Sequence, residues 1–325
     1  MTQAALFSAT SEITFANRWD HVLARFAYRR SDHRVQPGLY ALGEPDAQSS
    51  VFVTANYTLS FDALRGALDD IDAYILVLDT KGVNVWCAAG KGTFGTEELI
   101  SRIKSSGLSD IVSHRNLILP QLGATGVSAH KVKQATGFNV EYGPILARDL
   151  PEYLKTHTAT AEMRRMPFTL LDRLVLVPVE LVTTFLPFLG GSLAAYLTGG
   201  WFYVLWLLVA WLTGAAFFLL LLPLMPTREF TTKGLILGGL TAIPFLAWQF
   251  ARAEITFFQN LLSAVPMALI TTALVGYMGL NATGTTPVTS WTSVKREIKR
   301  YLPVLAGMAG TGTVLIILRL LGVGG

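Results

Sequence analysis

The chain has 325 residues, of which 51% are hydrophobic and 15% charged, so its composition excludes a wholly soluble protein. A single cysteine excludes an intramolecular disulfide, a thiolate zinc site and an iron–sulfur cluster held by this chain, because each needs several sulfur ligands. The net charge of +4 does not indicate nucleic acid, since several basic residues flank apolar segments instead of forming a stripe with interleaved aromatics.

Charged residues divide the chain into two halves. Asp, Glu, Lys and Arg number 34 in residues 1–168 and 14 in residues 169–325. We therefore predict a soluble domain at 1–160, a linker at 161–168 and a membrane domain at 169–325. The first twenty residues lack the continuous apolar core of a signal peptide, so we expect the first domain to lie in the cytoplasm.

Short apolar runs alternate with helical spacing in the first domain. We predict strands at 51–56, 73–79, 115–120 and 138–142. We predict helices at 61–68 with Ser60 as N-cap, at 96–104, and near 149–155. This alternation predicts a mainly parallel α/β sheet, which binds ligands beyond the C-terminal ends of its strands.

Five apolar segments of the second half are about long enough to span a membrane as helices. They cover 169–189, 201–222, 234–251, 256–280 and 301–321. The third is the weakest, because it is short and contains Pro244. Loops that are rich in basic residues alternate with loops that carry no charge or balanced charge. In one of these latter loops Arg252 is balanced by Glu254. The basic residues are Arg164, Arg165, Arg228, Lys233, Lys295, Arg296, Lys299 and Arg300. We therefore predict a multi-pass protein of the cytoplasmic membrane, with its N-terminal domain inside and its C-terminus outside.

Two kinds of residue in these spans merit attention. We interpret the tryptophans as interface anchors, with Trp206 and Trp211 packed deeper; the others are Trp201, Trp248 and Trp291. Glu180 is an ionisable group inside a span, where such groups are expensive and often functional. We favour a hydrogen-bonded glutamate between helices, because no second acid or buried lysine accompanies it to suggest a transport relay.

The segment from Asn84 to Thr96, NVWCAAGKGTFGT, surrounds the lone thiol of Cys87 with small residues, just beyond the predicted strand at 73–79. Its glycines match a dinucleotide fingerprint, but the required strand–turn–helix context is absent. An inert buried cysteine is the ordinary alternative. A small-residue turn beside Lys91 and before a helix N-terminus instead lowers a thiol pKa, and so favours a thiolate that ligates metals.

This segment resembles the signature of the corrinoid protein of the anaerobic mercury-methylation pair. The resemblance continues, in order along the chain, in PGLYALG (37–43), FVTANYTLSFDALR (52–65), AYILVLDTKG (73–82), PQLGATGVSAHKV (120–132) and DRLVLVPVELV (172–182). The soluble domain is also similar to the corrinoid-binding domain of the corrinoid iron–sulfur protein of the acetyl-CoA pathway. The resemblance implies a Rossmann-like α/β corrinoid-binding domain, followed by an all-α membrane domain of about five helices.

The resemblance implies a methyltransferase that carries methyl on the cobalt of a cobalamin-type corrinoid and forms methylmercury from Hg(II), with the Cys87 thiolate as lower axial ligand. It implies a ferredoxin-like partner with two [4Fe-4S] clusters, and a methyl donor protein of the methyltetrahydrofolate pathway. A methyl carrier for a different acceptor remains the alternative. A dinucleotide-binding oxidoreductase is less favoured.

The expected corrinoid-binding residues lie in the segment around Cys87 and in the loops that follow two predicted strands. They are Thr54, Asn56, Tyr57, Ser60, Asn84, Trp86, Cys87, Ala88, Gly90, Lys91, Gly92, Thr93, Gln121, Gly123, Ala124 and Gly126. Trp86 is equally consistent with a core residue. We interpret His130 as a solvated or capping histidine rather than a cobalt ligand.

Overall fold

A computed structural model describes residues 6–29, 31–251, 256–286 and 288–322, apart from the side chain of Trp291. Contacts divide the chain into two compact units, Met1–Pro167 and Phe168–Gly325. Each unit has its own hydrophobic core, so the two are described separately.

The first unit is built on one six-stranded sheet, in the order β1-β2-β4-β3-β5-β6. Its strands are β1 (Leu6–Ala9), β2 (Gly38–Leu42), β3 (Val51–Ala55), β4 (Ala73–Leu78), β5 (Asn116–Leu119) and β6 (Asn139–Tyr142). Strands β4, β3, β5 and β6 run parallel, whereas β2 pairs with β4 antiparallel and β1 is parallel to β2. The predicted parallel arrangement is thus confirmed only for four strands, and the sheet is mixed.

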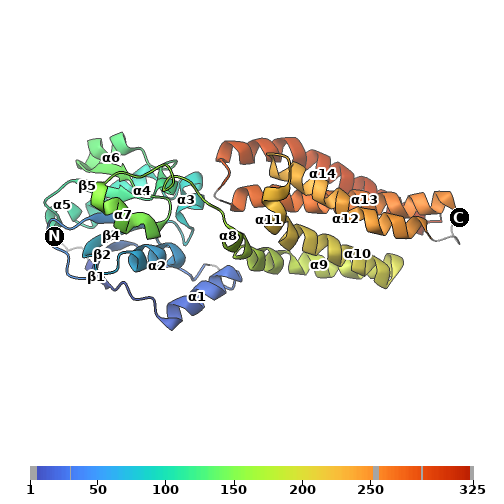
Figure 1. Ribbon diagram of the computed structural model, residues 1–325, viewed down its shortest axis with the longest axis horizontal. Coiled ribbons are helices and arrows are strands. Elements are labelled where there is room, and N and C mark those ends of the chain that lie inside the picture. Colours follow the sequence, from blue (N-terminus) through green and yellow to red (C-terminus); the bar gives the residue numbers. More distant parts are fainter. Residues whose placement is uncertain (1–5, 30, 252–255, 287, 323–325) are drawn as a thin grey trace. The chain divides into compact units, whose positions relative to one another are not determined.

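Helices cover both faces of this sheet, as Figure 1 shows. They are α1 (Phe15–Arg25), α2 (Thr58–Ala67), α3 (Val85–Lys91), α4 (Thr96–Ser105), α5 (Leu108–Ile111), η1 (Gln121–Gly123), α6 (Ala129–Thr136), η2 (Ala147–Asp149) and α7 (Leu150–Thr156). One core packs β3 and β4 against α3, α4 and α6, and the other packs them against α2 and α7. Every residue of β3 and β4 is buried, which explains their continuous apolar sequence.

The chain reverses its direction across the sheet at β3. It passes from β3 to β4 on one side, and then crosses back over β3 to reach β5 and β6 on the other. Parallel crossovers are right-handed, so this reversal puts the β3–β4 helix and the β4–β5 helices on opposite faces. In sheets of this kind ligands bind at the switch point, which lies here between the C-terminal ends of β3 and β5.

The structure corrects two sequence-based expectations in this unit. Strands β1 and β2 were not predicted, because Leu6–Ala9 and Gly38–Leu42 are short and pair at the edge of the sheet. Ser60 is not an N-cap: α2 begins at Thr58, with Tyr57 at the capping position, so Ser60 lies inside the first turn.

The second unit is entirely helical. Its elements are α8 (Leu170–Leu174), α9 (Val177–Gly199), α10 (Trp201–Leu212), η3 (Thr213–Phe217), α11 (Phe218–Leu221), η4 (Leu222–Leu224), α12 (Phe230–Phe250), α13 (Phe257–Thr285) and α14 (Trp291–Leu320). In the described part of the chain, five stretches are long and apolar enough to cross a membrane: Leu170–Gly199, Trp201–Leu224, Phe230–Phe250, Phe257–Thr285 and Thr292–Leu320. The predicted Arg252–Glu254 turn lies outside the described residues.

The weakest predicted span, the third, is held by close backbone packing. Gly234 and Gly238 are four residues apart on α12, and a Cβ on either would approach the backbone of α13 to below 3 Å. Small residues at this spacing let two helices approach closely in a membrane. Pro244 lies within α12 without ending it.

Several polar side chains inside the helical unit hydrogen-bond to neighbouring helices. Glu180 of α9 is 8% exposed and accepts a hydrogen bond from Asn281 Nδ2 of α13 at 3.2 Å. Trp206 and Trp211 are buried, and their indole nitrogens donate to hydroxyls on other helices, those of Thr271 and Thr184. Trp201 and Trp248 are exposed.

Candidate functional site at the parallel edge of the sheet

Cys87 lies in the first turn of α3, the short helix that follows β4. The side chain of Asn84 caps this helix by accepting a hydrogen bond from the backbone N–H of Cys87 at 2.9 Å. Gly92 ends the helix in the left-handed conformation, with φ of +85°, which favours glycine. Asn84 and Gly92 thus bound a short helical platform of seven residues, on which the thiol of Cys87 is half-buried. A helix N-terminus favours negative charge there.

The connection from β4 to β5 must cross β3, and this crossover brings α3 to the switch point of the sheet. There α3 packs on the loop that follows β5, with glycines at the contact. A Cβ on Gly126 would lie 2.1 Å from the Phe94 carbonyl oxygen and 3.0 Å from Ala89 Cα, and one on Gly123 would lie 2.5 Å from the Phe94 ring. These two glycines therefore set how closely the loop approaches the cysteine-bearing segment.

Asn56 organises the neighbouring strand ends. Its side chain is 2% exposed, and its Oδ1 accepts hydrogen bonds from Thr80 N at 3.1 Å, Thr80 Oγ1 at 2.9 Å and Gly82 N at 3.0 Å. Its Nδ2 donates to Asp79 Oδ1 at 3.4 Å. The amide of Asn56 therefore joins the end of β3 to the turn after β4 and holds this turn in position.

The sequence places the turn at 79–82 after a predicted strand, on the ligand-binding side of the sheet, but none of its residues is among the predicted corrinoid-binding residues. Asp79 Oδ1 accepts from Lys81 N, the pattern of an Asx-turn, and Lys81 Nζ also contacts the Asp79 carboxylate. Burial raises the pKa of Asp79, but the hydrogen bonds and charge of Lys81 outweigh it, so this pKa lies below its usual value. The residues Asp-Thr-Lys-Gly, with a glycine after a strand, are the signal that predicts this turn.

The remaining predicted site residues divide between the platform and its support. Gly90, Lys91 and Gly92 are exposed at the end of α3; Trp86, Tyr57, Ser60, Thr93, Gln121 and Ala124 are partly buried; Thr54 and Ala88 are buried. Gln121 Oε1 accepts from Arg164 Nη1 at 2.8 Å, a partner that the sequence did not reveal. His130 is exposed and its Nδ1 lies 3.0 Å from Ser128 Oγ.

The glycine fingerprint of a dinucleotide site does not have its required geometry. Helix α3 separates β4 from Gly92, and Gly95 directly precedes α4. The three glycines therefore lie within and between two helices instead of in the tight turn after a strand. The described residues also contain no group of three or more His, Cys, Asp or Glu side chains placed to hold a metal ion.

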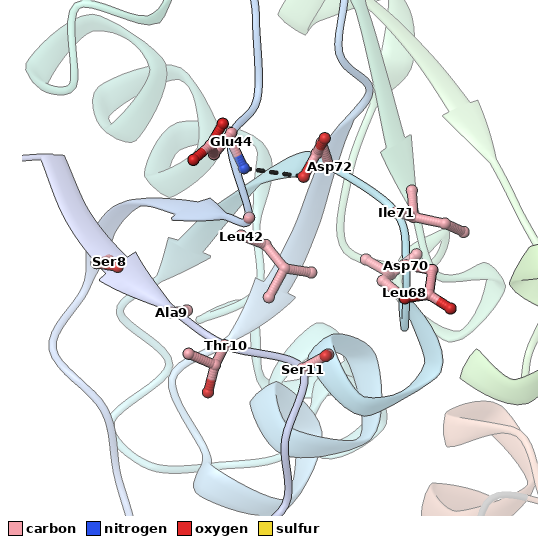
Figure 2. A pocket seen from close by; sticks show the side chains of 11 residues that line it. Ser8, Ala9, Thr10, Ser11, Leu42, Glu44, Leu68, Asp70, Ile71 and Asp72 are labelled. Atoms are coloured by element: carbon pink, nitrogen blue, oxygen red, sulfur yellow. Dashed lines mark hydrogen bonds between the residues drawn. The ribbon is translucent and has the colours of Figure 1, made fainter.

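A cavity of about 450 Å³ lies at the opposite end of the sheet, where β1 and β2 end and β4 begins. Figure 2 shows its polar side chains, among them Thr10, Glu44, Asp70 and Asp72. Asp72 Oδ1 accepts a hydrogen bond from Glu44 N at 2.8 Å, which joins the two loops that form the cavity. None of the predicted site residues lines it.

Comparison with known proteins assigns relatives to the first unit. Residues 23–154 match the family described as CO dehydrogenase/acetyl-CoA synthase delta subunit. The acetyl-CoA decarbonylase/synthase complex subunit gamma of Methanopyrus kandleri is 38% identical over 128 residues, covering 39% of this chain and 27% of that protein. The same subunit of Methanocaldococcus jannaschii is 32% identical over 130 residues, covering 39% of this chain and 26% of that protein.

A further relative carries a more specific name. The corrinoid/iron–sulfur protein large subunit of Moorella thermoacetica is 27% identical over 150 residues, covering 43% of this chain and 33% of that protein. The chain thus spans between about a quarter and a third of the length of these curated relatives. The first unit, which contains Cys87 and both strand ends of the switch point, is therefore a relative of subunits of the acetyl-CoA decarbonylase/synthase complex and of a corrinoid/iron–sulfur protein.

Proposed function

We propose that this chain is a membrane-anchored corrinoid protein that transfers methyl groups, with the Cys87 thiolate as the lower axial ligand of the cobalt. The observation that carries this proposal is the position of Cys87: a half-buried thiol in the first turn of a helix, at the ligand-binding edge of a domain related to a corrinoid/iron–sulfur protein. A thiolate is a soft metal ligand, and the helix N-terminus favours its charge.

The residues around Cys87 fit a large flat cofactor. The platform includes the small residues Ala88, Ala89, Gly90 and Gly92, and a Cβ built on Gly92 would meet no atom within 4 Å. The segment after β5 contacts α3, and α3 also contacts β3. Gln121 lies after β5, and Tyr57 and Ser60 lie after β3 at the start of α2; we propose that their amide and hydroxyl groups hydrogen-bond the amide side chains of a corrin ring. In this proposal α3 supplies the metal ligand, while these two segments hold the edge of the ring.

When bound, the corrinoid supplies the cobalt that accepts, carries and releases the methyl group. The chain's own part is to present Cys87, whose thiolate donates more electron density to a metal than an imidazole does. That donation suits an electrophilic acceptor, so we propose Hg(II) as the substrate and methylmercury as the product. The proposal is supported by the signature NVWCAAGKGTFGT around this residue.

The partners and location follow from the same proposal. One cysteine cannot hold an iron–sulfur cluster, so electrons come from a ferredoxin-like protein with two [4Fe-4S] clusters. Methyl groups come from a methyltetrahydrofolate-dependent donor protein. We propose that the chain lies in the cytoplasmic membrane with its first unit in the cytoplasm, which the length and apolar composition of the five helices and the basic residues of the connecting loops support.

The test compares Cys87→Ala with Asp72→Asn, a matched change at the opposite end of the sheet, in the full chain purified with its corrinoid. We expect Cys87→Ala to shift the absorption spectrum of the bound corrinoid and to abolish methylmercury formation, with unchanged circular dichroism. Asp72→Asn should change neither property. A normal spectrum and normal activity in Cys87→Ala would contradict the axial-ligand assignment.

The relatives of the first unit favour one second candidate, a corrinoid methyl carrier for another acceptor. Adding Hg(II) to the methylated protein with its reduced partner separates the two. Stoichiometric methylmercury supports Hg(II) as the acceptor, whereas retention of the methyl group on the protein favours the other acceptor.

A further inference from the structure

Helix α1 presents a row of large apolar side chains to solvent. Phe15, Trp19, Val22 and Phe26 are 81%, 55%, 38% and 48% exposed. They lie at spacings of four, three and four residues, which places them on one side of a helix. We call these four residues the outer stripe.

The opposite side of α1 faces the protein, and it combines the buried Ala24 with polar side chains that are paired. His21 Nε2 lies 2.7 Å from Asp62 Oδ2 of α2, and His33 Nδ1 lies 2.7 Å from Asp20 Oδ1. Asp62 is also bound by Arg65 Nε at 2.7 Å. The helix therefore has the reverse of the usual arrangement, in which the apolar face packs on the core and the polar face is solvated.

Positive charge accompanies the outer stripe. Residues 14–30 contain four arginines and a single acid, Asp20, which is on the inner side and paired with His33. Arg18 is exposed one helical turn from Phe15 and Val22, Arg25 is partly buried in the last turn, and Arg29 is exposed just beyond the helix. The acids that flank the segment, Glu12 and Asp32, lie outside it in the sequence.

We propose that the outer stripe of α1 inserts into the interface of an anionic lipid bilayer. Phenylalanine and tryptophan on one face, with arginines beside them, are the composition of helices that lie in the plane of a membrane. The charge complements acidic headgroups, which attract basic segments near a membrane surface. The same chain carries five candidate membrane spans, so the proposal rests on the proposed function, in which the chain is anchored in a membrane.

The second unit favours lipid as the occupant of the outer stripe. The family match covers residues 23–154, so Phe15 and Trp19 lie outside it. Membrane contact is the feature that this chain adds, through its helical second unit.

The test places a spin label on the outer stripe of the full chain in nanodiscs. Trp19→Cys and, as matched control, Lys104→Cys on the exposed side of α4 are labelled in a Cys87→Ser background, so that each chain carries one label. Accessibility to oxygen, which concentrates in lipid, is compared with accessibility to a nickel complex that stays in water. Discs of phosphatidylcholine with phosphatidylglycerol are compared with discs of phosphatidylcholine alone.

In anionic discs we expect the label at position 19 to be more accessible to oxygen than to the nickel complex. The label at position 104 should be more accessible to the nickel complex than to oxygen. The effect at position 19 should diminish in discs without phosphatidylglycerol. A label at position 19 that is open to nickel in both discs would overturn the proposal. A label shielded from both probes would also overturn it, in favour of contact with protein. Both substituted residues are exposed, so the variants should fold.

Discussion

The two ends of the sheet in the first unit differ in what they can bind. At the end where β3, β4, β5 and β6 terminate, two parts of the chain that are far apart in the sequence meet: the turn at 79–82 with the following α3, which carries Cys87, and the loop at 121–126. At the other end lies the cavity of about 450 Å³, lined by carboxylates and hydroxyls of short turns. The end with the cavity has no thiol, and the end with the thiol has the open platform.

This difference teaches that a hollow alone does not identify a binding site. The carboxylate of Asp72 at the cavity is engaged in joining two loops, whereas Asn84 and Asn56 at the parallel edge hold a helix and a turn in position around Cys87. Parallel strands bring their following loops to one edge, which is why chemically different groups gather there.

The largest expected effect tests the organisation of the parallel edge. Asn56→Ala leaves the Thr80 and Gly82 donors without their buried acceptor, and should lower the free energy of unfolding by about 2–4 kcal/mol. Asp72→Ala, at the exposed opposite end, removes one acceptor and should cost less than about 1 kcal/mol. Hydrogen exchange of β3 and β4 in the full chain measures both. Equal decreases in the free energy of unfolding for the two variants would contradict this difference between the two ends of the sheet.

A smaller effect is expected where the loop at 121–126 meets α3. The Cβ introduced by Gly126→Ala would lie 2.1 Å from the Phe94 carbonyl oxygen, so the loop must move away, at a cost of about 1–3 kcal/mol. The amount of corrinoid that the purified Gly126→Ala chain retains should also decrease. Thr125→Ala, an exposed neighbour, is the control and should retain the cofactor. Full retention in Gly126→Ala would show that this contact does not support the site.

The smallest effect concerns pH. The pKa of Asp79 is lower in the folded chain than its ordinary value of 3.8, so its ionised form stabilises the fold. This contribution is complete above pH ~4 and is lost as the pH falls through the folded pKa. Because Asp79 is partly exposed, the difference in stability between the native chain and Asp79→Asn should be at most about 1 kcal/mol at neutral pH. Thermal unfolding at several pH values checks that the difference shrinks on acidification.

Local sequence signals predicted the elements with strong internal patterns. The apolar runs that became β3 and β4 are continuous because both faces of these strands are covered, and the acids Glu97 and Glu98 indicated the start of α4. Strands β1 and β2 were missed because their four and five residues are stabilised by pairing with distant segments, which no local pattern reveals. Helix α1 was missed although local signals for it are present: Thr14 caps it, and Phe15, Trp19, Val22 and Phe26 recur at helical spacing.

By itself the sequence determined that a polar half precedes an apolar half with five segments of spanning length, and that Cys87 lies among small residues after a strand. These properties depend on composition and on neighbours along the chain, which sequence patterns record directly. Only the tertiary structure decided that α3 crosses the switch point to meet Gly123 and Gly126, and that Asn56 is engaged within the turn at 79–82. Such contacts join residues separated by more than twenty positions, and the order of strands in the sheet, which local signals do not specify, brings them together.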